Sequence, residues 1–157
     1  MKYKAGDVIE PITLKTAKGE TITIPDPSLQ FTHVQFNRWC GDPIGDQHIT
    51  GFRKAYQRIR DRSVQEVVFF YSENETIETH YTQVRLHMIG DPGKTYYKMF
   101  GVETSSKWLM KKKAWKDFVK GIGLHHFNFK AGKYGMNGLP ADFLIAKNGK
   151  ICACRYG

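Results

Sequence analysis

Segments typical of strands alternate with segments typical of helices along this chain of 157 residues. Residues 67–71 form a continuous apolar run, as expected of a central strand that is covered on both faces. Between residues 44 and 60, apolar side chains recur at spacings of three and four, which indicates an amphipathic helix. This alternation requires a mainly parallel central sheet with helices packed on both of its faces. We therefore expect an α/β fold.

Two hairpins are expected to add antiparallel strands. Asn148-Gly149 lies between two apolar runs and is the strongest two-residue signal for a hairpin turn. Near the N-terminus, Lys18-Gly19 separates two β-branched segments in the same way. Ser72 is predicted to be a helix N-cap, with Glu75 completing a capping box. The expected strands cover 12–14, 21–24, 31–36, 67–71, 86–89, 142–145 and 151–154; the expected helices cover 44–60, a segment after Ser72, 94–100 and a segment ending near 120, followed by a glycine-rich loop over 123–138.

Three separated segments carry a more specific pattern. Residues 36–48 read Phe-Asn-Arg-Trp-Cys-Gly-Asp-Pro-Ile-Gly-Asp-Gln-His, residues 90–102 read Gly-Asp-Pro-Gly-Lys-Thr-Tyr-Tyr-Lys-Met-Phe-Gly-Val, and residues 138–150 read Gly-Leu-Pro-Ala-Asp-Phe-Leu-Ile-Ala-Lys-Asn-Gly-Lys. The last segment resembles the proline loop and final hairpin of thioredoxin-fold proteins. The middle segment resembles the corresponding part of peroxiredoxins. Together they make residues 5–156 similar to the peroxiredoxin-like branch of the alkyl hydroperoxide reductase/thiol-specific antioxidant (AhpC/TSA) family.

The resemblance implies a thioredoxin-like three-layer sandwich, with a mixed central sheet, helices on both faces and an N-terminal β-hairpin. It implies a cis bond between Leu139 and Pro140, in a loop that faces the redox cysteine. It also implies a thiol oxidoreductase that needs no cofactor, acts on a hydroperoxide or a disulfide, and is restored by an external thiol. Beside the proline loop, we expect Trp39 and His48 to line the pocket for the substrate or redox partner.

The active-site segment departs from the family pattern. In an ungapped alignment, Asp42 and Gly45 occupy the two cysteine positions, and Cys40 lies two residues upstream. A second alignment matches Trp39-Cys40-Gly41 to the start of the thioredoxin motif, whose second cysteine is again absent here. Either the nucleophile has moved to Cys40 or it has been lost, and the sequence leaves both alternatives open.

Physical arguments for an activated Cys40 point in two directions. A thiol at a strand-to-helix junction lies near the unsatisfied amides of the helix, which stabilise a thiolate. Arg38 would add positive charge, whereas the carboxylate of Asp42 opposes a second negative charge. Pro43 suits the first helical turn with Asp42 as N-cap, which would leave Cys40 ahead of the helix. Cys40, Arg38, Asp42 and Pro43 are therefore the candidate catalytic residues, and the alternative is an ordinary cysteine beside a capped helix.

The remaining cysteines and histidines are interpreted as structural, and the alternative for Cys152 or Cys154 is a role as a resolving cysteine. Cys152 and Cys154 alternate with Ala153, so they share one face of a strand, where neighbouring cysteines rarely suit a disulfide. We expect both to be reduced and mostly buried, because free cysteine packs as a small hydrophobic residue. His125-His126 lies at no recognisable metal-ligand spacing, so no metal site is expected.

The net charge of +9 comes from 24 Lys and Arg against 15 Asp and Glu, with a dense cluster at 111–113. No zinc-finger, helix-turn-helix or RNA-binding pattern accompanies that cluster, so we interpret it as a solvated helix face and expect no nucleic-acid partner. Three cysteines do not make a disulfide framework, and no run approaches the roughly 18 apolar residues of a membrane span. A cytoplasmic protein without membrane contact is expected.

The sequence predicts a single domain over residues 1–157 that acts as a one-cysteine thiol oxidoreductase. The alternative is a redox-inactive thioredoxin-fold binding or scaffold protein. The chain stops at Gly157, directly after the last expected strand, where thioredoxin folds usually continue into a covering helix. We therefore expect a partner subunit, such as a second copy in a homo-oligomer, or a truncated chain.

Overall fold

A mixed five-stranded sheet lies at the centre of the computed structural model, which describes residues 1–41, 43–102 and 141–156, and only the backbone of 43–45, 47 and 48. The strands lie in the order β5 (His87–Gly90), β4 (Val64–Phe70), β3 (Phe31–Phe36), β6 (Ala141–Ala146) and β7 (Ile151–Tyr156). β3, β4 and β5 run parallel, whereas β6 is antiparallel to both β3 and β7. A separate antiparallel hairpin is formed by β1 (Ile12–Lys15) and β2 (Thr21–Ile24).

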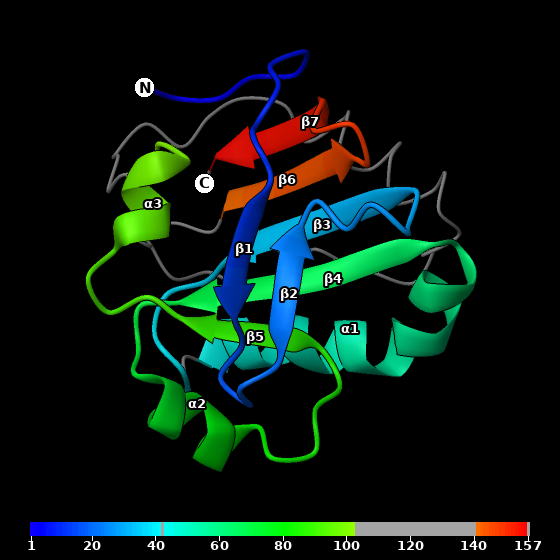
Figure 1. Ribbon diagram of the computed structural model, residues 1–157. Helices are drawn as coiled ribbons and strands as arrows, with labels where there is room; N and C mark the ends of the chain where they lie inside the picture. Colours follow the sequence, from blue (N-terminus) through cyan, green and yellow to red (C-terminus); the bar gives the residue numbers. More distant parts are fainter. Residues whose placement is uncertain (42, 103–140, 157) are drawn as a thin grey trace.

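Both faces of the sheet are covered. Figure 1 shows the β1–β2 hairpin crossing in front of the sheet and α1 (Pro43–Asp61) lying behind it. α2 (Asn74–His80) packs on the same side as α1, and α3 (Thr95–Met99) joins the hairpin side. This architecture confirms the expected α/β fold with a mixed sheet, helices on both faces and an N-terminal hairpin.

Two apolar cores follow from the alternation of side chains along the strands. On the hairpin side, Phe36 of β3 stacks on Phe69 of β4 with ring centroids 4.9 Å apart. On the other side, Phe52 and Ile59 of α1 pack against the opposite face of β4, including Phe70. Every residue of β4 is buried, as expected for a central strand between two layers.

The turn between β6 and β7 confirms the predicted Asn148-Gly149 hairpin. Gly149 has φ of 85°, a left-handed conformation that residues with a Cβ rarely adopt. A Cβ at this position would also lie 2.4 Å from the carbonyl oxygen of Ile9, which runs beside the turn. Glycine is therefore required here for both its backbone conformation and its lack of a side chain.

Two sequence-based expectations near the centre of the chain are wrong in detail. β4 begins at Val64 rather than at 67, because Gln65 and Glu66 are buried in the sheet despite being polar. Ser72 is not the N-cap of α2: Glu73 is, with an extended backbone and no capping side-chain hydrogen bond. The hydroxyl of Ser72 instead accepts a hydrogen bond from the backbone N–H of Cys40, 2.9 Å away.

The expectation of buried cysteines in the last strand holds only in part. Cys152 and Cys154 are both free thiols, as expected, and Cys154 is half-buried beside the hairpin-side core. Cys152 is exposed, contrary to the prediction. It lies at a register shift between β6 and β7, where Leu144 pairs with Ala153 and Ile145 with Ile151, so no residue of β6 lies opposite it.

Several other expectations concern residues outside the described ranges. They are the helix ending near 120, the loop over 123–138, and the cis bond at Leu139-Pro140, which stays a prediction. No helix in the described ranges combines the length and apolar character needed to cross a membrane.

Candidate active site

Cys40 lies in the loop between β3 and α1, at the edge where the parallel strands end. The backbone carbonyl of Arg38 accepts a hydrogen bond from the N–H of Tyr71, at 3.1 Å. Two residues later, the N–H of Cys40 donates to Ser72. The segment after β3 is thus tied to the segment after β4, and this pairing fixes the backbone around the thiol.

The Cys40 thiol points toward α2 and is poorly suited to ionise. Its sulfur donates to the backbone carbonyl of Thr76, 3.8 Å away, and the side chain is half-buried against the core between α1 and α2. Burial, together with the negative charge of Asp46, raises the pKa of Cys40 from 9.0 to about 11. The expected activating environment is therefore not found, because burial and a carboxylate both disfavour the thiolate.

Asp46 anchors a polar cluster next to Cys40. One oxygen of its carboxylate lies 3.2 Å from Nε2 of His80, and the other accepts a hydrogen bond from the hydroxyl of Tyr81. Burial and this carboxylate raise the pKa of Tyr81. The ring of His80 also lies against Gly41, 3.7 Å from the position that a Cβ would take there. The loop after Cys40 is therefore held against the C-terminal end of α2.

A groove of about 290 Å³ opens beside this cluster. That volume is near the lower end of the range for small-molecule sites. Its walls come from α1 and from the end of α2 with the residues that follow it. The lining residues are Asp46, Ile49, Thr50, Arg53, His80, Tyr81, Thr82, Gln83 and Val84.

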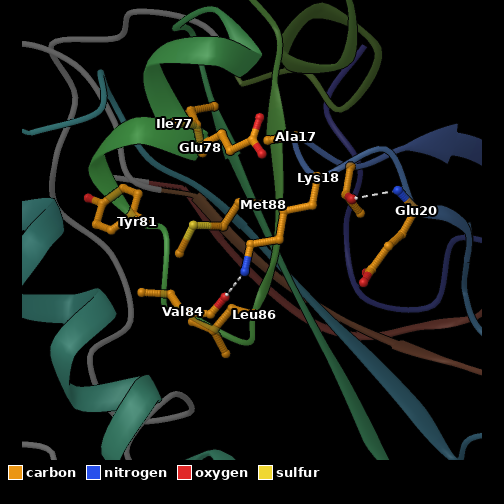
Figure 2. Close-up of a pocket in the computed structure, with 10 residues that line it drawn as sticks. Ala17, Lys18, Glu20, Ile77, Glu78, Tyr81, Val84, Leu86 and Met88 are labelled. Carbon is orange, nitrogen blue, oxygen red and sulfur yellow. Dashed lines mark hydrogen bonds between the residues drawn. The ribbon is translucent and has the colours of Figure 1, made fainter.

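A second, much smaller cavity separates the β1–β2 turn from α2 and β5 (Figure 2). Its volume of about 10 Å³ is at most that of one water molecule. Lys18 reaches across it, and its ammonium group donates to the carbonyl of Val84 at 2.8 Å. This cavity is a packing feature that fastens the hairpin to the helix layer, and it has no room for a substrate.

Arg38 and Trp39 lie together on the surface. The Arg38 guanidinium stacks over the Trp39 ring, 4.8 Å from its centroid. Trp39 is 46% exposed and packs beside Tyr71, with ring centroids 6.4 Å apart. Arg38 is thus held against an aromatic ring, and it is not among the groups that shift the pKa of Cys40.

The structure brings only part of the predicted site together. Pro43 is the first residue of α1 and His48 lies in its second turn, but the structure describes only the backbone of these two residues. Asp42, Leu139 and Pro140 lie outside the described residues. Among the described side chains, no group of three or more His, Cys, Asp and Glu is arranged to hold a metal ion.

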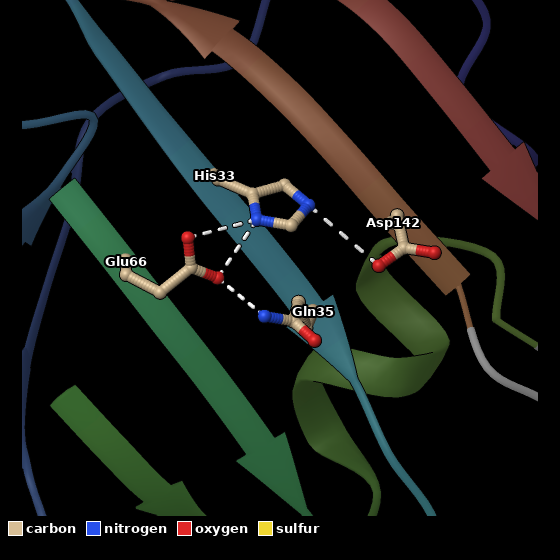
Figure 3. A network of polar contacts seen from close by, with 4 residues as sticks. All are labelled: His33, Gln35, Glu66 and Asp142. Atoms are coloured by element: carbon tan, nitrogen blue, oxygen red, sulfur yellow. Dashed lines mark hydrogen bonds and ion pairs between the residues drawn. The ribbon is translucent and has the colours of Figure 1, made fainter. Parts of the chain in front are cut away.

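A second polar cluster, which the sequence analysis missed, joins side chains of β3, β4 and β6 (Figure 3) on the side of the sheet that α1 covers. Nδ1 of His33 lies 2.7 Å and 2.9 Å from the two carboxylate oxygens of Glu66, and the amide of Gln35 donates to the same carboxylate. On the other side of the ring, Nε2 lies 3.6 Å from an oxygen of Asp142. The ring of Phe52 packs on the imidazole at 5.4 Å between centroids.

Burial makes the charges of this cluster strongly interdependent. Burial alone lowers the pKa of His33, but Glu66 and Asp142 outweigh it and raise that pKa to about 10. Burial raises the pKa of Glu66, and the positive charge of His33 opposes that rise. At neutral pH the cluster therefore retains a proton, held between the imidazole and the carboxylate. The signal available in the sequence is the presence of polar residues within largely apolar strands: His33 and Gln35 in β3, Glu66 in β4 and Asp142 in β6.

No protein-family model and no curated protein matches the sequence. Solved structures do match. Peroxidoxin BcpB from Mycobacterium tuberculosis is 14% identical, with a TM-score of 0.70 over 98% of this chain and 85% of that protein. A yeast mitochondrial 1-Cys peroxiredoxin is 12% identical, with a TM-score of 0.69 over 99% of this chain and 68% of that protein. A protein described as the thiol:disulfide interchange protein DsbE, from Chlorobium tepidum, is 17% identical, with a TM-score of 0.64 over 100% of this chain and 87% of that protein.

These matches confirm the resemblance to peroxiredoxins at the level of three-dimensional structure. Identities of this size establish the arrangement of the strands and helices, and the activity has to be argued from the residues at the site. The chain has the thioredoxin-like fold, in the form that peroxiredoxins share.

Proposed function

We propose that this chain is a one-cysteine thiol oxidoreductase in which Cys40 reacts with a hydroperoxide or a disulfide. The observation that carries the proposal is the place of Cys40, half-buried at the β3–α1 junction of a fold whose solved examples include peroxiredoxins. A reducing compartment such as the cytoplasm would supply the external thiol that this chemistry needs.

The proposed cycle with a hydroperoxide runs through a sulfenic acid. The Cys40 thiolate attacks one oxygen, the O–O bond breaks, and the alkoxide leaves as an alcohol with the proton released by the thiol. Sulfur is oxidised and the peroxide is reduced. One external thiol then condenses with the sulfenic acid, releasing water and forming a mixed disulfide. A second external thiol displaces Cys40 and leaves as a disulfide.

The raised pKa predicts that this reaction is slow at neutral pH. A thiolate is the nucleophile, so a rise in pKa from 9.0 to about 11 lowers the reactive fraction about a hundredfold at neutral pH. The same observation favours the second candidate, a redox-inactive thioredoxin-fold binding protein. Asp42 and Gly45, at the positions where the family pattern has cysteines, also favour it.

The three cysteines of the chain allow a matched comparison. Cys152→Ser/Cys154→Ser leaves Cys40 as the only thiol, and Cys40→Ser/Cys154→Ser leaves the exposed Cys152 as an ordinary reference. For each variant, alkylation by iodoacetamide against pH gives the thiolate fraction, and loss of thiol in hydrogen peroxide gives the oxidation rate. We expect Cys40 to react at least tenfold faster per thiolate than Cys152, and a dithiol reductant to restore it.

A Cys40 thiolate that reacts no faster than that of Cys152 would exclude the oxidoreductase and leave the binding protein. The same conclusion follows if oxidised Cys40 is not restored by the external thiol. Correcting for the thiolate fraction is essential, because a high pKa alone makes any cysteine slow at neutral pH.

A further inference from the structure

Four side chains form a row at the carboxyl ends of the parallel strands β3, β4 and β5, close to Cys40. Arg38 lies over the ring of Trp39, Trp39 lies beside Tyr71, and the ammonium group of Lys94 lies 4.6 Å from the centroid of the Tyr71 ring. Two cations thus bracket two aromatic rings. We call Arg38, Trp39, Tyr71 and Lys94 the cation–aromatic row.

The backbone fixes the positions of this row, and it holds one member, Lys94, in an unfavourable conformation. Arg38 is held beside Tyr71 by the hydrogen bond between their backbones. Lys94 has φ of 55° and ψ of 34°, a left-handed conformation that costs a residue with a Cβ on the order of 1–2 kcal/mol. The buried carboxylate of Asp91, which accepts the N–H groups of Thr95 and Tyr96, fixes the turn that contains it. A strained residue that delivers its side chain to an exposed site is a sign of function.

The chemistry of the row favours an organic anion. The two cations are already placed against ring faces, so binding would require little further ordering of their side chains. Trp39, which is 46% exposed, adds aromatic surface that suits an apolar group. In open α/β sheets, ligands usually bind at the carboxyl ends of the parallel strands, where this row lies. The net charge of +9 attracts anions to the molecule as a whole.

We propose that the cation–aromatic row binds a small organic carboxylate, with the charge at Lys94 and the apolar part along Tyr71 and Trp39. Single-stranded nucleic acid fits less well. Its bases would have to stack on the ring faces over which Arg38 and Lys94 lie, whereas an alkyl chain can pack against the exposed edges of the rings. We further identify this ligand as the oxidising substrate of Cys40, an organic hydroperoxide with a carboxylate group. That identification alone rests on the proposed function of Cys40.

Binding is tested without any reaction, by calorimetric titration with octanoate and with the uncharged octanamide. We expect the wild-type protein to bind octanoate about fivefold more tightly than octanamide, since only octanoate pairs with the ammonium group of Lys94. Lys94→Asn removes one cation and keeps a residue that tolerates the left-handed conformation. It should weaken octanoate about fivefold and leave octanamide unchanged.

Lys98→Gln is the matched control, because Lys98 is an exposed lysine of the same α3 that lies outside the row. Equal binding of the two probes, no binding of octanoate, or equal effects of the Lys94 and Lys98 variants would each overturn the proposal. Displacement of octanoate by poly(U), with an affinity that falls steeply with salt, would also overturn it in favour of nucleic acid. Melting temperatures of both variants exclude a loss of fold as the cause.

The substrate assignment has its own readout. In the variant with Cys40 as the only thiol, we expect a carboxylate-bearing hydroperoxide to oxidise the sulfur about fivefold faster than its methyl ester, and added salt to reduce this difference. If neither peroxide oxidises Cys40 while octanoate still binds, the proposed function fails and the carboxylate site stands. Equal rates with both peroxides would overturn the substrate assignment alone.

Discussion

Two clusters on the α1 side of the sheet pair a histidine with a carboxylate, in opposite environments. The side chains of His33 and Glu66 are 4% and 2% exposed, whereas those of His80 and Asp46 are 44% and 36% exposed. Burial removes solvent screening, so each charge of the first cluster depends on its partners. In the second cluster water screens the pair, which contributes little to stability. The comparison separates a cluster that holds the fold together from one that influences a neighbouring thiol.

The largest expected effect comes from breaking the buried cluster. His33→Leu leaves the buried carboxylate of Glu66, and the partly buried one of Asp142, without their cation. We expect a loss of about 3–5 kcal/mol in the free energy of unfolding. The corresponding His80→Leu variant breaks the exposed pair and should cost about 1 kcal/mol or less. Equilibrium unfolding in urea measures both values. Similar losses in the two variants would contradict the contrast between the clusters.

The second effect is a pH dependence that belongs to the buried cluster. The pKa of His33 is raised from 6.5 to about 10 in the folded state, so the folded protein binds this proton more tightly than the unfolded chain does. The resulting stabilisation is fully present below pH 6.5 and is lost as the pH rises toward 10. The raised pKa of Glu66 acts in the same direction. We expect the free energy of unfolding to fall by a few kcal/mol between pH 6.5 and 10.

The His33→Leu variant provides the control for this pH dependence, provided that enough of it stays folded to measure. It should show a much flatter stability profile over the same range, since the titrating imidazole is absent. His80→Leu should keep the wild-type slope. An unchanged slope in His33→Leu would show that other groups cause the loss of stability at high pH.

The sheet could be predicted from the sequence, but the buried cluster within it could not. The alternation of apolar segments predicted the sheet, and Asn148-Gly149 predicted its last hairpin. The buried cluster was missed because Gln65 and Glu66 were taken to precede the strand that begins at 67. In the observed register, His33 lies directly opposite Glu66. The role of polar residues in buried strands can be recognised only when the pairing of distant strands is known. Local periodicity does not give that pairing.

The exposed site shows a different limit of prediction. The position of Cys40 between a strand and a helix was correct, and it suggested an activated thiol. The direction of the sulfur depends on the hydrogen bond to Ser72 and on the carbonyl of Thr76, both far along the chain. Asp46, six residues beyond Cys40, was not recognised as a neighbour of the thiol, because its placement depends on Tyr81 and His80. Contacts between segments that are distant in the sequence are not encoded in any local spacing.

The smallest effect concerns the charge of Asp46 on the thiol. Burial is the larger cause of the raised pKa of Cys40 and Asp46 is the second, so removing the charge should lower the pKa only partly. In the variant with Cys40 as the only thiol, Asp46→Asn should increase alkylation by iodoacetamide at pH 8 roughly threefold to tenfold. Asp61→Asn makes the same charge change at the far end of α1, about 22 Å along the helix axis, and should leave the rate unchanged. Alkylation that is equally fast with and without the Asp46 charge would mean that burial alone suppresses the thiol. The exposed cluster would then contribute neither stability nor control of reactivity. A clear increase would instead show that a carboxylate too exposed to stabilise the fold still sets the charge state of its half-buried neighbour.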